Sequence, residues 1–209
     1  MKNVISRITL FLSAALIAVG AQAADAPKAP DQVVQDATAQ LLQLLHDNHA
    51  KYKADNKLYY KTVNDVVVPY FDVPYIGRLV LGRNAKTATD DQRTRFQNAF
   101  KDMLIRSYAN AMLDNYDSVK ASWQPLRMPA GATDVTVSSN LVRDGKPPIP
   151  VGFAMHQVGS DWKIYDITVE NISLVISFRT QINEEIKKNG IDSVITRMES
   201  GQYAAKPKT

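Results

Sequence analysis

The spacing of apolar residues changes twice along the chain, and these changes limit the possible folds more than any other feature. In residues 31–49 and 89–115, apolar side chains recur every three or four positions, which is typical of amphipathic helices. In residues 118–169 they alternate with polar side chains, as in strands with one buried face. Helical spacing returns in residues 173–189. Helices, then antiparallel strands, then helices predict an α+β domain.

Local signals place the ends of these helices. Thr89 and Gln92 form the two halves of a capping box, in which each side chain bonds to the other residue's free amide. Asp72 is suited to cap a short helix that Gly82 ends, because glycine adopts the left-handed conformation that closes many helices. Gly190 ends the last long helix in the same way. These signals define the helix boundaries more closely than the periodicity does.

The first 23 residues have the three parts of a secretory signal peptide. Lys2 and Arg7 form a basic start, residues 8–19 an uncharged and mostly apolar run, and Ala21-Gln22-Ala23 the small-x-small pattern of a cleavage site. A membrane-spanning helix needs about 20 apolar residues, so this shorter run is not expected to remain as an anchor. The sequence predicts cleavage before Ala24 and export from the cytoplasm.

One domain is expected after the signal peptide. Residues 24–30 form a flexible lead-in, residues 31–201 the domain and residues 202–209 a polar tail, because no linker or repeat interrupts the middle range. The chain has no cysteine, which excludes disulfides, thiolate metal sites and lipid attachment to cysteine. The formal net charge of +4 includes two cations of the signal peptide, and the other charges alternate in sign, unlike a nucleic-acid-binding stripe.

Residues with the chemistry for catalysis or metal binding are few and scattered. His46 and His49 lie one helical turn apart, but two ligands do not make a metal site and no third ligand is evident. His156 is expected to be exposed. Asp166 and Tyr165 could form an acid–base pair, yet neighbours on a strand face opposite sides unless a bulge intervenes. Asp166 is therefore expected to be a hydrogen-bonded structural carboxylate. The sequence therefore predicts no catalytic residue, no metal and no cofactor.

A set of short segments spans nearly the whole chain after the signal peptide. They are Pro69-Tyr70-Phe71-Asp72, Leu79-Val80-Leu81-Gly82, Thr87-Ala88-Thr89, Gln92-Arg93, Phe96, residues 162–167, Ser173-Leu174-Val175, Arg179, Gln181 and Gly190-Ile191-Asp192. In this order they resemble the MlaC-type family of periplasmic phospholipid-binding proteins, also called toluene-tolerance proteins. The chain departs from the family at Asn84-Ala85, where bulky aromatic residues are usual, and at Asn171, where glycine is common.

The resemblance implies a non-enzymatic carrier of glycerophospholipid in the periplasm. Members of the family carry lipid between an outer-membrane lipoprotein–porin complex and an inner-membrane ABC transporter with a membrane-anchored ring of MCE domains, a system that maintains outer-membrane lipid asymmetry. The implied fold is a curved antiparallel sheet wrapped by helices, similar to the NTF2-like cone, with acyl chains in an internal cavity. The implied partners are diacyl glycerophospholipid and these two membrane complexes, and the implied state is a monomer.

The apolar residues that the sequence offers for such a cavity lie on the predicted helices and strands. They are Val80, Leu81, Phe100, Leu104, Tyr108, Val137, Leu141, Phe153, Met155, Ile164 and Val175. Spacing does not separate the wall of a cavity from ordinary core, since both place apolar side chains on one face. Two other functions stay open: an adaptor that binds only proteins, and an NTF2-like isomerase or dehydratase.

Overall fold

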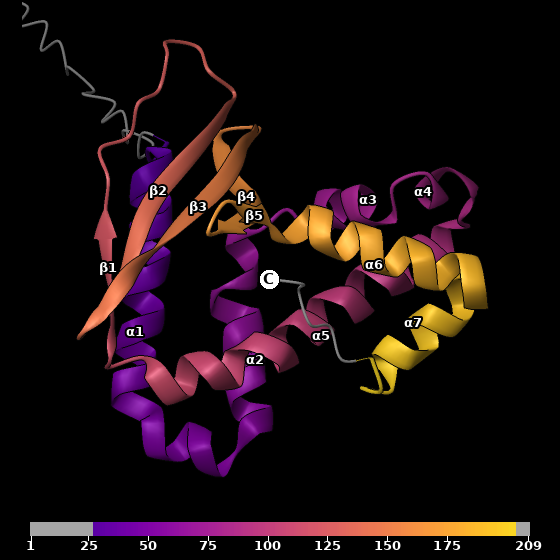
Figure 1. Ribbon diagram of the computed structural model, residues 1–209, viewed down its shortest axis with the longest axis horizontal. Helices are drawn as coiled ribbons and strands as arrows, with labels where there is room; N and C mark the ends of the chain where they lie inside the picture. Colours follow the sequence, from indigo (N-terminus) through magenta and orange to yellow (C-terminus); the bar gives the residue numbers. More distant parts are fainter. Residues whose placement is uncertain (1–26, 204–209) are drawn as a thin grey trace, which may run out of the picture.

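The computed structural model describes residues 27–203 of the chain. The signal peptide predicted for residues 1–23, the first part of the predicted lead-in and residues 204–209 of the predicted tail lie outside the described residues. The described part is an α+β structure in which helices pack around an antiparallel sheet, as the sequence predicts (Figure 1). No helix within residues 27–203 is long and apolar enough to span a membrane.

Two long helices, α1 (Pro30–Ala54) and α5 (Asp90–Asn115), join the parts of the structure. Helix α5 has 26 residues and is therefore about 39 Å long. One end of it lies below the sheet, and the other end packs among α3, α6 and α7 (Figure 1). The shorter elements are α2 (Asn56–Val66), the 3-10 helix η1 (Val68–Tyr70), α3 (Val73–Leu81), α4 (Asn84–Thr87), α6 (Leu174–Asn189) and α7 (Ile191–Glu199).

The strands form a meander in which each strand pairs antiparallel with the next. They are β1 (Val119–Trp123), β2 (Asp134–Arg143), β3 (Lys146–Val158), β4 (Asp161–Val169) and β5 (Ile172–Ser173). Gly145 and Gly159 close two hairpins with φ angles of 68° and 63°, a conformation that glycine adopts without strain. The alternating pattern predicted β1 to β4. Strand β5 has only two residues, too few to show alternation.

Strand β4 contains one extra residue, and this bulge changes which side chains share a face. Phe153 of β3 lies opposite Ile167, and the register shifts before Ile164, so Tyr165 is the inserted residue. Strict alternation would place Asp166 on the same face as Ile164. Because of the bulge, Ile164 and Ile167 share the face that packs against α1, while Asp166 lies on the other face.

Buried apolar side chains form three clusters among the described residues. The sheet cluster lies between the sheet and α1 and contains Val34, Val137, Met155, Trp162 and Ile164. The hairpin cluster joins α1, α2 and α5 and contains Leu41, Leu45, Tyr52, Tyr59, Ala109 and Leu113. The helical cluster joins α3, α5, α6 and α7 and contains Val80, Leu81, Phe96, Ala99, Phe100, Met103, Phe178, Ile182, Val194, Ile195 and Met198. Helix α5 contributes to two of the clusters and so ties them together.

The predicted helix caps are confirmed. The N–H of Gln92 donates to Oγ1 of Thr89 at 3.1 Å, and the N–H of Thr89 donates to Oε1 of Gln92 at 3.0 Å. Oδ1 of Asp72 accepts a hydrogen bond from the N–H of Tyr75 at 2.9 Å. Gly82 follows α3 with a φ of 57°. Local hydrogen bonding therefore fixes these boundaries before any packing is considered.

Two predicted boundaries differ from those of the structure. Helix α1 begins at Pro30, inside the predicted lead-in, because proline fits the first turn of a helix. Tyr203 belongs to the predicted polar tail, but it packs against the helical cluster. Its N–H donates to the carbonyl oxygen of Arg197 at 3.0 Å, and the guanidinium of Arg197 lies over its ring. An aromatic ring in a polar segment can still be part of a core.

Thr89→Ala should lower the free energy of unfolding by about 0.5–2 kcal/mol, because it removes the acceptor for the N–H of Gln92. The control is Thr94→Ala in the same helix. Thr94 is exposed, and alanine has the higher helix propensity, so this change should leave stability unchanged or slightly raised. Urea denaturation measures both variants. Wild-type stability in Thr89→Ala would contradict the capping role.

Candidate functional site

The face of the sheet that packs against α1 provides one wall of the candidate site. Val137, Phe153 and Ile167 lie opposite one another on β2, β3 and β4, within the range of cross-strand contact. The ring of Trp123 extends this row, with its centroid 5.9 Å from that of Phe153. Val137 is buried, whereas Phe153 and Ile167 are only partly buried. The row therefore runs from packed core to apolar surface that other side chains do not fully cover.

Helix α5 supplies a second set of apolar side chains. Met103 is buried in the helical cluster, while its neighbour Leu104 borders that cluster and is only partly buried. Tyr108 lies one turn further along the helix and is also partly buried. Its hydroxyl oxygen is shielded from solvent and has no hydrogen-bond partner among the described residues. Burial raises the pKa of Tyr108, so the hydroxyl keeps its proton.

Burial divides the eleven residues predicted for the pocket into two groups. Six of them are at most 3% exposed, so protein atoms surround them in two different clusters. These six are Val80, Leu81 and Phe100 in the helical cluster and Val137, Met155 and Ile164 in the sheet cluster. The other five are partly buried and retain surface for a ligand: Leu104, Tyr108, Leu141, Phe153 and Val175.

The structure separates one of these residues from the others and adds one that the sequence missed. Leu141 lies near the β2–β3 turn, opposite Ile149 and outside the three clusters. Ile167 lies beside Phe153 on the apolar face of the sheet. Alternation counted from Ile164 places Ile167 on the opposite face, and no turn residue in the sequence marks the bulge.

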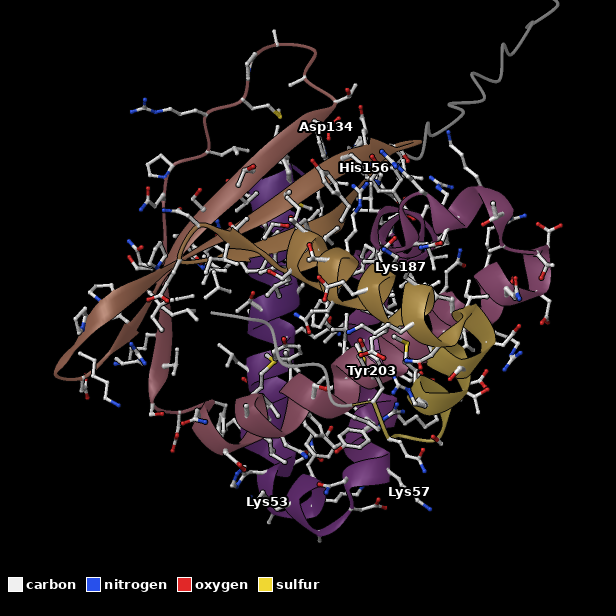
Figure 2. The ribbon with its side chains drawn as sticks, turned by 45° about the vertical axis from the view of Figure 1, so that its right-hand side comes forward. Lys53, Lys57, Asp134, His156, Lys187 and Tyr203 are labelled. Carbon is white, nitrogen blue, oxygen red and sulfur yellow. The ribbon has the colours of Figure 1, made fainter. Side chains whose placement is uncertain are left out.

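A polar group lies on the other face of the sheet, beside the start of α3. Nε2 of His156 lies 3.0 Å from Oδ2 of Asp72. The ring centroids of Tyr75 and Tyr165 lie 4.6 Å and 5.1 Å from that of His156, and Asp134 lies at the same end of the sheet (Figure 2). Burial, and then Asp134, raises the pKa of Tyr165. The prediction that His156 is exposed is wrong, because α3 covers this part of the sheet and leaves its side chain 16% exposed.

The carboxylate of Asp166 bonds to the start of α6. Its Oδ2 accepts a hydrogen bond from the hydroxyl of Ser173, and its Oδ1 accepts one from the N–H of Val175 at 3.0 Å. A carboxylate in this position also interacts favourably with the dipole of the helix. The prediction of a hydrogen-bonded structural carboxylate is confirmed. The bulge does place Tyr165 on the same face, but its ring packs against His156.

His46 and His49 lie on α1, away from the apolar wall. His46 is exposed, whereas the ring of His49 packs against Tyr116, with 5.2 Å between the centroids. Within residues 27–203, no group of three His, Cys, Asp or Glu side chains is placed to hold a metal ion. The structure thus gives the pair no third ligand.

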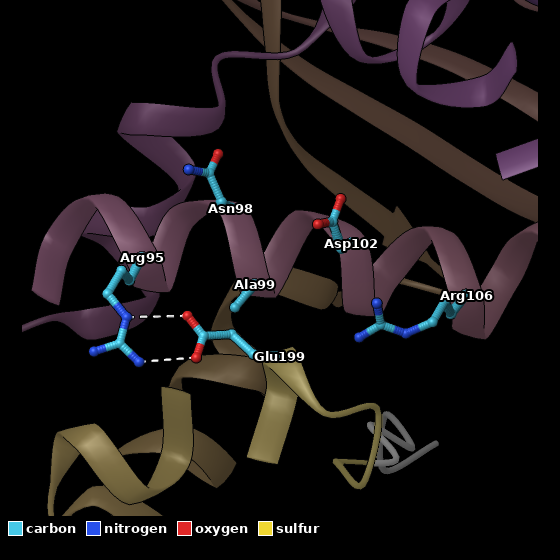
Figure 3. Close-up of a pocket in the computed structure, with 6 residues that line it drawn as sticks. All are labelled: Arg95, Asn98, Ala99, Asp102, Arg106 and Glu199. Atoms are coloured by element: carbon cyan, nitrogen blue, oxygen red, sulfur yellow. Dashed lines mark hydrogen bonds and ion pairs between the residues drawn. The ribbon is translucent and has the colours of Figure 1, made fainter. Parts of the chain in front are cut away.

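A pocket between α5 and α7 has charged walls (Figure 3). Arg95 donates two hydrogen bonds to the carboxylate of Glu199, at 3.0 and 2.8 Å. Arg106 donates to the carbonyl oxygen of Met198 at 2.7 Å, and Asp102 also lines the pocket, which has a volume of about 270 Å³. An apolar ligand would remove water from these charges, at a large cost in free energy. The bonds instead hold α7 against α5.

The fold and the partly buried apolar side chains define an α+β protein with an apolar candidate site on its sheet and on α5. The sequence matches the family model described as MlaC protein over residues 35–200. The chain therefore belongs to the MlaC family.

Individual relatives agree with this assignment. The chain is 29% identical over 195 residues to the toluene tolerance protein ttg2D of Pseudomonas putida, covering 92% of this chain and 87% of that protein. It is 26% identical over 210 residues to the intermembrane phospholipid transport system binding protein MlaC of Haemophilus influenzae, covering 99% and 95%. A phospholipid-binding protein from Ralstonia solanacearum, solved in complex with a phospholipid, has the same fold, with a TM-score of 0.76, 24% identity and coverage of 83% and 97%.

Asp166→Ala should lower the free energy of unfolding by about 1–3 kcal/mol, because the N–H of Val175 and the hydroxyl of Ser173 lose their acceptor. The control is Asp161→Ala on the same strand, whose side chain is exposed and whose loss should change stability by less than about 0.5 kcal/mol. Chemical denaturation compares the two variants. Equal stabilities would mean that Asp166 does not hold the start of α6.

Proposed function

We propose that this chain is a periplasmic, non-enzymatic carrier of glycerophospholipid between the outer and inner membranes. Membership of the MlaC family is the observation that carries the proposal. Further support comes from the relative named as the binding protein of an intermembrane phospholipid transport system and from the fold shared with a protein solved with a phospholipid. The apolar surface left on the sheet and on α5 offers acyl chains a place to bind.

The physical requirement on such a carrier is the cost of wetting acyl chains. Two chains contain about 28 methylene groups, and exposing each costs about 0.8 kcal/mol, so full exposure would cost more than about 20 kcal/mol. The protein must therefore enclose the chains almost completely. A bilayer gives the same shelter, so transfer between membrane and carrier is close to balance. The direction of lipid transport must therefore be set by the partner proteins.

We assign the wall of the lipid site to the partly buried side chains. They are Leu104, Tyr108, Phe153, Ile167 and Val175. The fully buried members of the predicted set act as the packed core behind this wall. The unpartnered hydroxyl of Tyr108 would donate to an ester carbonyl of the lipid, because a buried donor costs free energy until it is bonded. The charged head group would stay near water, since burying an unpaired phosphate is unfavourable.

The proposed partners are those that the resemblance to the MlaC family implies. At the inner membrane the partner is the membrane-anchored MCE-domain ring of an ABC transporter, and at the outer membrane it is a lipoprotein–porin complex. The chain works as a monomer in the proposal, because one lipid enclosed by one domain needs no second copy. Residues 1–23 act as the signal peptide that brings the chain to this compartment.

Protein purified from the periplasmic fraction without detergent should carry one diacyl phospholipid per chain. Mass spectrometry under native conditions should then give a mass larger than the denatured mass by one lipid, and the denatured mass should correspond to a chain that starts at Ala24. Protein that is stripped of lipid and refolded should melt at a lower temperature, because a ligand bound only to the folded state stabilises it. A lipid-free protein that takes up no lipid from vesicles would favour the protein-binding adaptor.

Neighbouring residues on α5 separate the wall from the core. Leu104→Trp adds bulk to a partly buried side chain, so it should displace lipid and leave the melting temperature of the stripped protein nearly unchanged. Met103→Trp is the matched control, because Met103 is 1% exposed and extra bulk there should cost about 1–3 kcal/mol of stability. Native mass spectrometry and thermal melts of stripped protein measure both effects. Leu104→Trp protein that keeps its lipid would place the site elsewhere.

A further inference from the structure

One side of α6 borders α3 and stays open to solvent. Ile176, Arg179 and Asn183 are three and four residues apart, so they lie on the same side of α6. Nδ2 of Asn183 donates to the carbonyl oxygen of Val80 at 2.8 Å, which places this side against α3. The guanidinium of Arg179 lies over Gly82, where a Cβ atom would come within 2.8 Å of its Nε. Together α3 and α6 therefore form one outward face.

The apolar member of this face is unusually exposed. Ile176 is 65% exposed, more than any other large apolar side chain that the structure describes. Ile172, four residues earlier, is 37% exposed. Neither has a role in the buried clusters. Ile172 and Ile176 therefore leave apolar surface exposed at the start of α6, next to the charged side chains of the same face.

The α3–α6 face also carries three arginines, Arg78 on α3, Arg83 just after it and Arg179 on α6. Arg78 lies one helical turn before Gly82, on the side of α3 that Arg179 covers, and Arg83 follows Gly82 directly. All three arginines are exposed. Among the residues that the structure describes, no carboxylate lies within ion-pairing distance of any of them. Arg78 instead lies over the ring of Tyr75, 5.2 Å from its centroid.

We infer that this α3–α6 face, formed by Arg78, Arg83, Ile176 and Arg179, docks the protein on the surface of an anionic phospholipid bilayer. The inference rests on the proposed function, because a lipid carrier has to approach the bilayer that gives or receives its cargo. Unpaired arginines match the phosphates of anionic head groups, and an exposed aliphatic side chain can enter the boundary between head groups and acyl chains. The long arginine side chains reach around it to the phosphates.

Two features of the face favour this partner. The dipole at the C-terminal end of α3 stabilises cations there, which accounts for Arg78 and Arg83 but not for the exposure of Ile176. An anionic bilayer accounts both for the positive charge of the arginines and for the exposure of Ile176. One inserted side chain and three cations give weak, reversible attachment, which suits a protein that must leave the membrane again.

Vesicle flotation tests the inference with the full mature protein. Wild type should float with vesicles made of equal parts of phosphatidylglycerol and phosphatidylcholine, and not with vesicles of phosphatidylcholine alone. Added salt should weaken the binding. The double variant Arg78→Gln, Arg179→Gln should bind the anionic vesicles about fivefold more weakly for each arginine removed. Ile176→Ser should also weaken binding but keep its dependence on salt.

The control removes the same charge elsewhere. Lys51 and Lys57 are exposed beside the α1–α2 turn, and Figure 2 shows Lys57 at the far end of the molecule from His156, which lies next to α3. Lys51→Gln, Lys57→Gln should bind vesicles as wild type does. Equal losses in the two double variants, or no flotation of wild type, would overturn the inference, and the second result would leave an acidic protein surface as the partner.

Native mass spectrometry of the same samples separates this inference from the proposed function. Variants of the α3–α6 face should retain their phospholipid and lose only vesicle binding. Wild-type protein that floats but neither carries phospholipid nor takes it up from the vesicles would contradict the carrier function while the docking face stands. Wild-type protein with cargo that does not float would overturn the docking face alone.

Discussion

Two aspartates on or beside strand β4 hold the helical layer against the sheet. The N–H of Asp72 donates to the carbonyl oxygen of Ile164 at 3.0 Å, and the side chain of Asp72 caps α3 and contacts His156. Asp166 extends from β4 and bonds to the first turn of α6. A carboxylate at a helix start satisfies free N–H groups and interacts with the helix dipole. Because α5 and α7 pack on α3 and α6, these two side chains help to place the helical layer.

The bulge at Tyr165 reconciles this anchoring with the apolar face of the sheet. If strict alternation continued through Tyr165, Asp166 would face the sheet cluster, where an unpaired carboxylate would be costly. The role of Asp166 was predicted correctly but from an alternation that the bulge breaks, whereas local chemistry made the caps and the hairpins predictable from sequence. The bulge and the burial of His156 were not, because they depend on how α3 meets the sheet. The alternation of side chains along a strand does not indicate where a helix such as α3 contacts the sheet.

The candidate site shows a different limit of prediction. Helical spacing correctly predicts an apolar environment for both Met103 and Leu104. It does not predict that Met103 is fully buried by protein whereas Leu104 is only partly buried. The difference in burial depends on which helices and strands pack against each residue, and this is determined only when the layers assemble. The same limit applies to the sheet, where Val137 and Phe153 are direct cross-strand neighbours with different burial. Periodicity predicts apolar faces, whereas burial in the fold divides them into core and wall.

The three clusters of the described residues fit the needs of a carrier better than one fused core would. A single domain usually buries its apolar side chains in one contiguous core. Here the sheet cluster and the helical cluster are distinct, and partly buried side chains such as Phe153 and Leu104 border them. Larger side chains on those borders could join the clusters and stabilise the empty protein, but they would occupy the surface that a lipid needs. Stability and binding would then be in direct competition, a common cost at functional sites. The proposed lipid resolves the competition by supplying the missing apolar contacts only while it is bound.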